Sequence, residues 1–143
     1  MSEQRTSTLQ PQPPGIPTGG RSTAAAPYWE ACRNGELRYQ RCGACHTVNM
    51  KPARSCAYCG EHALSWEPSA GRGRLYSWTV VWRPQHPSFH VPYAPAIVEL
   101  DEGVYVMTAI IGCEPEDLRP GLPVEVEFHP ANDEVTLPYF RPV

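Results

Sequence analysis

Long apolar segments are missing from this sequence of 143 residues. The longest run, residues 104–111, is interrupted by Thr108 and is far shorter than the eighteen or so residues that cross a bilayer. The amino terminus has no apolar stretch of the kind found in a secretory signal. We therefore expect no membrane span and a cytoplasmic location. A chain of this length makes one ordinary domain or two very small ones, which excludes a large self-contained catalytic fold.

The residue patterns of an independent enzyme are missing as well. The sequence shows no paired acid and base and no nucleophile triad. Cys32 and Cys113 lack the neighbouring His and Asn or Asp that would mark an activated thiol, so we expect them to be small buried hydrophobes. The sequence therefore argues against catalysis by the chain alone.

Charge is unevenly distributed along the chain. Residues 1–93 carry ten Lys/Arg and five Asp/Glu, whereas residues 94–143 carry two and ten. Partners will therefore meet two different surfaces. A negative carboxy-terminal half disfavours nucleic-acid binding, which needs cations along the phosphate backbone.

The amino-terminal third predicts a tail and a short helix. Residues 1–26 offer almost no large apolar side chain to bury, and we expect a disordered Pro/Gly-rich tail. A helix is expected from Pro27 to Asn34, with Tyr28 and Trp29 on a side that must dock on something, because two turns are not stable alone. The rest of the segment 27–41 alternates like a strand leading into the first cysteine pair.

Two CxxC pairs in residues 42–67 give the strongest signal: Cys42 with Cys45, and Cys56 with Cys59. Two such knuckles close a tetrahedral cage of four sulfurs that suits zinc, and with all four ligands used the metal is structural. A redox CxxC would need a βαβ unit that is absent, and disulfides do not suit the cytoplasm. His46 and His62 are expected to be surface residues.

Residues 68–143 predict an all-β domain. Alternation indicates strands at 74–82 and 124–128, and a hairpin turn at 101–103 indicates two more at 94–100 and 104–111. A fifth strand is expected at 135–140, and a small helix or turn at 115–118. Five short strands fit an OB-like barrel better than a seven-stranded sandwich. The first and third strands are apolar on both faces, so the tail helix and loops, or a partner protein, must cover the outside.

Helix, ribbon and barrel in this order resemble a known family. The resemblance rests on the segments 28–29, 35–37, 40–45, 56–60, 71–81, 97–103, 121–124 and 138–140, and it covers residues 27–143. The chain resembles the acyl-CoA-associated proteins with a rubredoxin-like zinc ribbon and an OB-fold, known as domain of unknown function thirty-five. The fold it implies is mainly β, with a short helix, a zinc ribbon and a five-stranded OB barrel.

The resemblance implies a role as the small partner of a larger enzyme. Family members bind thiolase-like enzymes or MaoC-like enoyl-CoA hydratases, and some serve aldolases in steroid side-chain breakdown. In this chain the four cysteines of the CxxC pairs would hold zinc, the helix would help to dock the partner, and the barrel would lie beside an acyl-CoA channel. The leading hypothesis is an accessory subunit of a thiolase-fold enzyme, with a hydratase as the alternative partner.

An acyl-CoA channel needs cations at its mouth and apolar walls. Candidate residues for CoA are Arg72, Arg74, Arg83, Trp82, Phe89 and, along the apolar arm, Trp78 and Tyr93. Candidate docking residues are Tyr28, Trp29, Trp78, His86 and His90, the histidines lying in a proline-stiffened loop. The competing interpretation is that the arginines and histidines are solvated and the aromatics simply pack.

Overall fold

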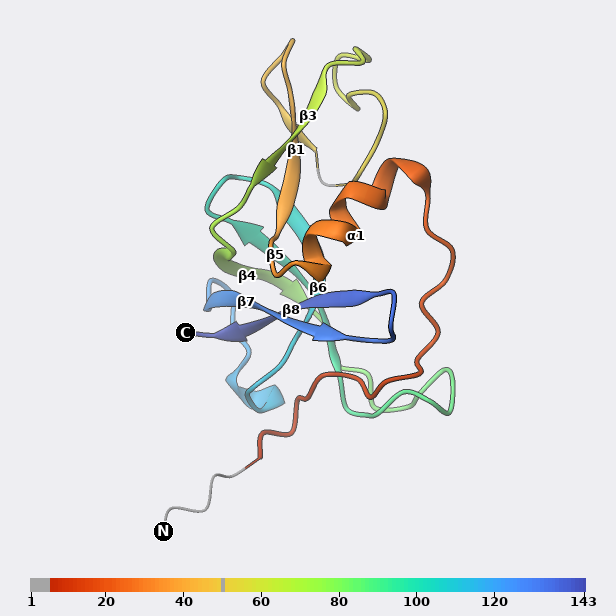
Figure 1. Cartoon of the computed structure of the whole chain (residues 1–143). Coiled ribbons are helices and arrows are strands. Elements are labelled where there is room, and N and C mark those ends of the chain that lie inside the picture. Colours follow the sequence, from red (N-terminus) through yellow and green to blue (C-terminus); the bar gives the residue numbers. More distant parts are fainter. Residues whose placement is uncertain (1–5, 50) are drawn as a thin grey trace.

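The computed structural model describes residues 6–49 and 51–143. A 3-10 turn η1 (Thr23–Ala25) leads into helix α1 (Ala26–Arg33), and a second turn, η2 (Pro115–Asp117), precedes the last hairpin. The strands are β1 (Arg38–Cys42), β2 (Val48–Asn49), β3 (Leu64–Pro68), β4 (Arg72–Trp78), β5 (Ala94–Leu100), β6 (Tyr105–Ile110), β7 (Pro123–Pro130) and β8 (Thr136–Pro142). Figure 1 shows how α1 and the longer strands are arranged. In the described part of the chain, no helix has the length and apolar character to cross a bilayer.

The second half of the chain is a closed five-stranded barrel. Its strand order is β4-β5-β6-β8-β7, and β7 pairs back to β4. The only parallel contact among these strands joins β6 to β8 at Ile110 and Phe140. Phe140, Val98 and Leu75 fill the interior at 2% exposure or less. The expected OB-fold barrel and the mainly β class are confirmed.

The first barrel strand is shorter than the alternation predicted. We expected residues 74–82, but β4 ends at Trp78, and beyond it only an isolated bridge joins Val81 to Tyr93. A register shift between Leu75 and Ser77 interrupts the pairing with β5. A bulge of this kind places one extra residue on the strand and changes which side chains share a face. Tyr76 is consequently exposed while Trp78 is half-buried.

The zinc ribbon and the barrel share one core. The ribbon is a three-stranded sheet of order β2-β1-β3. Tyr39 on β1 and Leu37, the residue before β1, belong to the same buried cluster as the barrel residues Val98 and Phe140. Helix α1 adds Tyr28 to this cluster, and the Tyr28 ring lies 6.4 Å from the ring of Trp66 on β3. Ribbon, helix and barrel therefore pack as mutually dependent parts.

The amino-terminal segment differs from the expected disordered tail. Residues 7–22, which we call the N-terminal strap, run past the β7–β8 hairpin before entering η1 (Figure 1). Leu9 is 0% exposed within the main core, and its backbone N–H and C=O pair with Cys113 and Gly112. Ile16 packs with Ala131 and Val135. Leu9 and Ile16, two apolar side chains of a polar, Pro-rich segment, are thus each buried in a defined cluster.

Replacing Leu9 with Ala is expected to lower the free energy of unfolding by about 2–4 kcal/mol, because a fully buried leucine leaves a cavity. Denaturant unfolding of the zinc-loaded chain measures the change. Thr18→Ala, at an exposed strap position, is the matched control and should cost less than about 0.5 kcal/mol. Equal stabilities of the two variants would contradict the buried position of Leu9.

Candidate functional site

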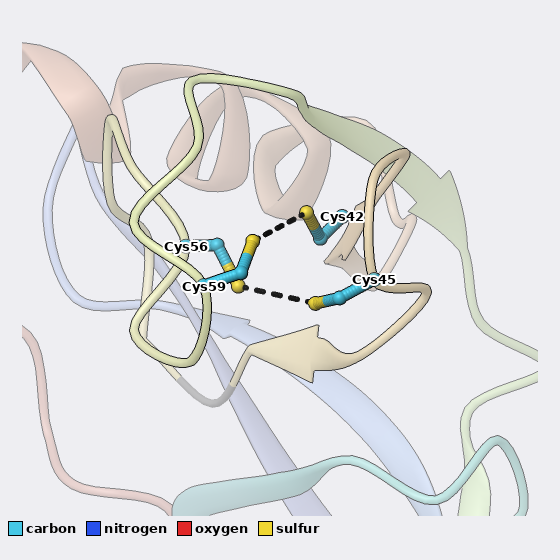
Figure 2. Close-up of side chains that lie close together, drawn as sticks. All are labelled: Cys42, Cys45, Cys56 and Cys59. Atoms are coloured by element: carbon cyan, nitrogen blue, oxygen red, sulfur yellow. Dashed lines mark hydrogen bonds between the residues drawn. The ribbon is translucent and has the colours of Figure 1, made fainter.

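The four cysteines converge at one end of the three-stranded ribbon sheet. Cys42 ends β1 and Cys45 lies in the turn that follows, whereas Cys56 and Cys59 lie in the loop before β3, and all four sulfurs face one another (Figure 2). The Sγ atoms of Cys42 and Cys59 lie 3.6 Å apart, and those of Cys45 and Cys56 lie 3.7 Å apart. All four sulfurs fall within 4.8 Å of one another, and none is in a disulfide.

Both knuckles have the same backbone geometry. The N–H of His46 donates to the carbonyl of Cys42 at 2.9 Å, and the N–H of Gly60 donates to the carbonyl of Cys56 at 3.0 Å. Each donor residue adopts a positive φ, 64° at His46 and 77° at Gly60. A left-handed residue at this position closes the tight turn that each CxxC forms.

The cysteine geometry fits zinc. Sulfurs about 2.3 Å from a central Zn²⁺ in a tetrahedron lie about 3.8 Å from one another, close to the two measured separations. Backbone N–H groups of Cys59 and Tyr58 lower the pKa of the Cys56 thiol to about 6, which favours the thiolate that binds metal. With four thiolate ligands the metal would have no open position for water, and its role would be to hold the ribbon together.

Two buried polar residues that we did not predict support the second knuckle. Gln40 on β1 is 4% exposed; its side chain donates to the carbonyl of Ala53 at 3.0 Å and accepts from the Ala53 N–H at 2.9 Å. Asn49 on β2 is 6% exposed and accepts from the N–H of Ala57 at 3.2 Å. Only the fold shows that these amides fix the loop that carries Cys56.

The histidines near the cysteines stay outside the cluster. His46 and His62 are both exposed. Within residues 6–49 and 51–143, the group of ligand atoms close enough to share a metal consists of the four cysteines alone. Cys32 and Cys113 are buried elsewhere, as expected, and burial raises the pKa of Cys113 to about 11. The predicted ligand set is therefore the one the structure assembles.

Four of the predicted aromatic residues line one apolar groove. Tyr28 and Trp29 from α1 meet Phe89 and Tyr93 from the loop of residues 83–93, which we call the aromatic loop, around a hollow of about 320 Å³. The strap and strands β5, β6 and β8 complete its walls. Trp78, also predicted, borders a neighbouring hollow with Met107.

The remaining candidates are not gathered into this groove. Arg72 and Arg74 lie exposed on β4, and Arg83 is exposed at the start of the aromatic loop. Trp82 is 62% exposed and does not line the groove. His86 is exposed, with its Nδ1 2.6 Å from the Ser88 hydroxyl. His90 is exposed too, and its backbone contacts the strap.

Replacing Cys42 with Ala is expected to abolish stoichiometric zinc and unfold the ribbon, because structural zinc contributes on the order of 10 kcal/mol of folding free energy in such sites. Metal content by mass spectrometry after gel filtration measures the loss. The matched control is Cys113→Ala, which removes a buried thiol outside the cluster and should retain one zinc per chain. Zinc loss from both variants would contradict the assignment.

Replacing Gly60 with Ala is expected to destabilise the zinc-loaded chain by about 1–2 kcal/mol through backbone strain. No atom lies within 4 Å of the added Cβ, so crowding contributes nothing. Gly20→Ala is the control, since that position has equal space and no positive φ. Thermal unfolding compares the two variants. Equal unfolding midpoints for Gly60→Ala and Gly20→Ala would contradict the left-handed backbone at Gly60.

Comparison with known proteins gives matches to both halves of the chain. Residues 29–65 match the ChsH2 rubredoxin-like zinc ribbon domain, and residues 66–129 match the ChsH2 C-terminal OB-fold domain. One relative, a probable enoyl-CoA hydratase alpha subunit of Thermomonospora curvata, is 37% identical over 99% of this chain and 43% of its own length. The chain thus spans less than half of that relative.

Two further matches cover most of the matched protein. A DUF35 domain-containing scaffold protein of Methanocaldococcus jannaschii is 32% identical over 72% of this chain and 79% of its own length. A solved chain of the Ltp2-ChsH2(DUF35) aldolase is 38% identical, with a TM-score of 0.77 over 88% of this chain and 98% of the solved one. With its four-cysteine ribbon joined to a closed OB barrel, the chain belongs to the DUF35 family.

Proposed function

We propose that this chain is an accessory subunit that binds a larger acyl-CoA enzyme of the thiolase fold, such as an aldolase in side-chain degradation, and helps to form its acyl-CoA site. The observation that carries the proposal is the similarity to the DUF35 chain of the Ltp2-ChsH2(DUF35) aldolase, of which this chain covers 98% at 38% identity. In this proposal the partner supplies the catalytic groups.

The outer face of β6 supports a docking role. Met107 is 71% exposed and borders three adjoining hollows. Tyr28 and Trp29 line two of these hollows, and Trp78 lines the third. Large apolar side chains that gather on a surface are typical anchors of protein interfaces. The partner would cover this face, with His86 and His90 of the aromatic loop at its rim.

The exposed cations support a contact with CoA. Guanidinium groups bind phosphate oxygens in a fork, and Arg72, Arg74 and Arg83 are all exposed. Trp82, also exposed, follows Val81 into the same loop as Phe89 and offers an apolar wall. In the complex these residues would meet the nucleotide end and the apolar arm of the thioester.

A MaoC-like enoyl-CoA hydratase is the second candidate partner. The Thermomonospora curvata relative is named as a probable hydratase alpha subunit, and this chain matches only 43% of it. More than half of that relative therefore has no counterpart in this chain. A hydratase partner would use the same docking face and the same acyl-CoA chemistry.

Co-expression with a thiolase-fold aldolase and, separately, with a MaoC-like hydratase is expected to yield a stable complex with the aldolase on gel filtration. Met107→Asp should weaken that complex at least tenfold, because a carboxylate at the centre of an apolar interface loses its hydration. Val143→Asp places the same charge at another exposed apolar side chain and is the matched control.

Acyl-CoA turnover by the partner, with and without this chain, tests the functional part. Turnover should fall at least tenfold when the chain is omitted. A chain that elutes alone beside the aldolase and leaves its turnover unchanged would overturn the proposal. A complex with the hydratase only would replace the first partner with the second.

A further inference from the structure

The short strand β2 and the residue before it present two polar side chains to the sulfur cluster. The N–H of Cys42 on β1 donates to the carbonyl of Thr47 at 2.9 Å, so these two residues lie opposite each other. Successive residues of a strand point to opposite faces, and Thr47 and Asn49 therefore share the face that carries the Cys42 side chain. Val48, between them, packs against the core shared with the barrel.

Thr47 contacts a sulfur of the first knuckle. Its Oγ1 lies 3.3 Å from the Sγ of Cys45. In a zinc-bound cluster this sulfur is a thiolate, which has no proton to donate, so the hydroxyl is the donor. Hydrogen bonds to a charged acceptor are stronger than those between neutral groups. The Thr47 hydroxyl would thus stabilise the form of Cys45 that binds the metal.

Asn49 contacts a sulfur of the second knuckle. Its Oδ1 accepts from the N–H of Ala57 at 3.2 Å, which leaves Nδ2 as the donor that lies 4.0 Å from the Sγ of Cys56. The backbone N–H of Tyr58 reaches the same sulfur at 3.4 Å. Because Cys56 is only 3% exposed, water has little access to replace these donors.

The two side chains serve neighbouring ligands. Cys45 and Cys56 come from different knuckles, and their sulfurs lie 3.7 Å apart (Figure 2). In the part of the chain that the structure describes, Thr47 and Asn49 are the only side chains outside the cluster that form a hydrogen bond with one of its sulfurs. Four thiolates outweigh the charge of one Zn²⁺, so donors at this pair reduce the repulsion where the two knuckles meet.

We propose that Thr47 and Asn49 are positioning residues of the zinc site, which hold the Cys45 and Cys56 thiolates in place and slow the release of the metal. Removal of a group that donates to a metal ligand typically changes metal affinity by about 10–100-fold. The proposal gives β2 a role in retaining zinc. It goes beyond the proposed function, because it requires no partner enzyme.

The first test changes the hydroxyl alone. The full, zinc-loaded chain is mixed with an excess of the chromogenic chelator pyridylazoresorcinol, and absorbance follows the transfer of zinc. Thr47→Val removes the hydroxyl at nearly equal volume and should release zinc about tenfold faster, whereas Thr47→Ser keeps the hydroxyl and should release it at the rate of the parent chain. Thr18→Val makes the same change at an exposed strap position and is the matched control.

The second test separates the two contacts of the amide. Asn49→Asp can still accept from the N–H of Ala57 but cannot donate to Cys56, and it should release zinc at least about tenfold faster. Asn49→Leu removes both contacts and is the comparison. If only the contact with Ala57 mattered, Asn49→Asp would retain zinc like the parent chain and Asn49→Leu alone would lose it, which would contradict the donor role.

Replacement of zinc with Co²⁺ gives a readout that a merely structural role would not move. Loss of a hydrogen bond raises the energy of the sulfur electrons, so the thiolate-to-cobalt charge-transfer band should shift to longer wavelength in Thr47→Val and Asn49→Asp. It should stay in place in Thr47→Ser and Thr18→Val. An unshifted band in Thr47→Val and Asn49→Asp, even with faster zinc release, would overturn the proposal, as would equal release from Thr47→Val and Thr18→Val.

Discussion

The sulfur cluster is the constraint on which the rest of the structure depends. A sheet whose second strand has two residues cannot order itself by burial alone, and the four sulfurs bring its two knuckles to one point. The ordered ribbon also supports the barrel, because Tyr39 on β1 and Leu37 just before it are part of the shared core. Metal binding at one end thus stabilises the surface against which helix α1 packs.

Sequence was sufficient where the deciding contacts are local. The CxxC spacing predicts the knuckles because each closes within five residues. The strand at 94–100 was predicted with the bounds of β5 because the hairpin turn that ends it, at residues 101–103, is also local. The family resemblance added the order of zinc ribbon and OB barrel along the chain. The two family domains that match residues 29–65 and 66–129 confirm this order. The bulge after Leu75 escaped prediction because an alternating pattern on both sides hides one inserted residue.

The strap could not be predicted because its contacts lie far away in sequence. Thr8 donates to the Glu114 carboxylate across 106 residues, and Gln12 reaches Tyr139 across 127. A single leucine among polar residues and prolines has no periodicity, so composition indicates disorder. Gln40 and Asn49 were missed for the same reason: a buried amide has no signature until the loop that it binds is placed.

Strap, loop and helix are energetically linked through the groove that they surround. Leu9 secures one end of the strap in the barrel core, and Gln12, three residues on, holds His90 of the aromatic loop. The same loop presents Arg83 to solvent and Phe89 to the groove, and the exposed Trp82 directly precedes it. Any displacement of the strap would therefore move charged and apolar contacts together. A partner seated on the β6 face would meet both sets of side chains in one fixed arrangement, which is the arrangement that recognition of a ligand with a charged end and an apolar end requires.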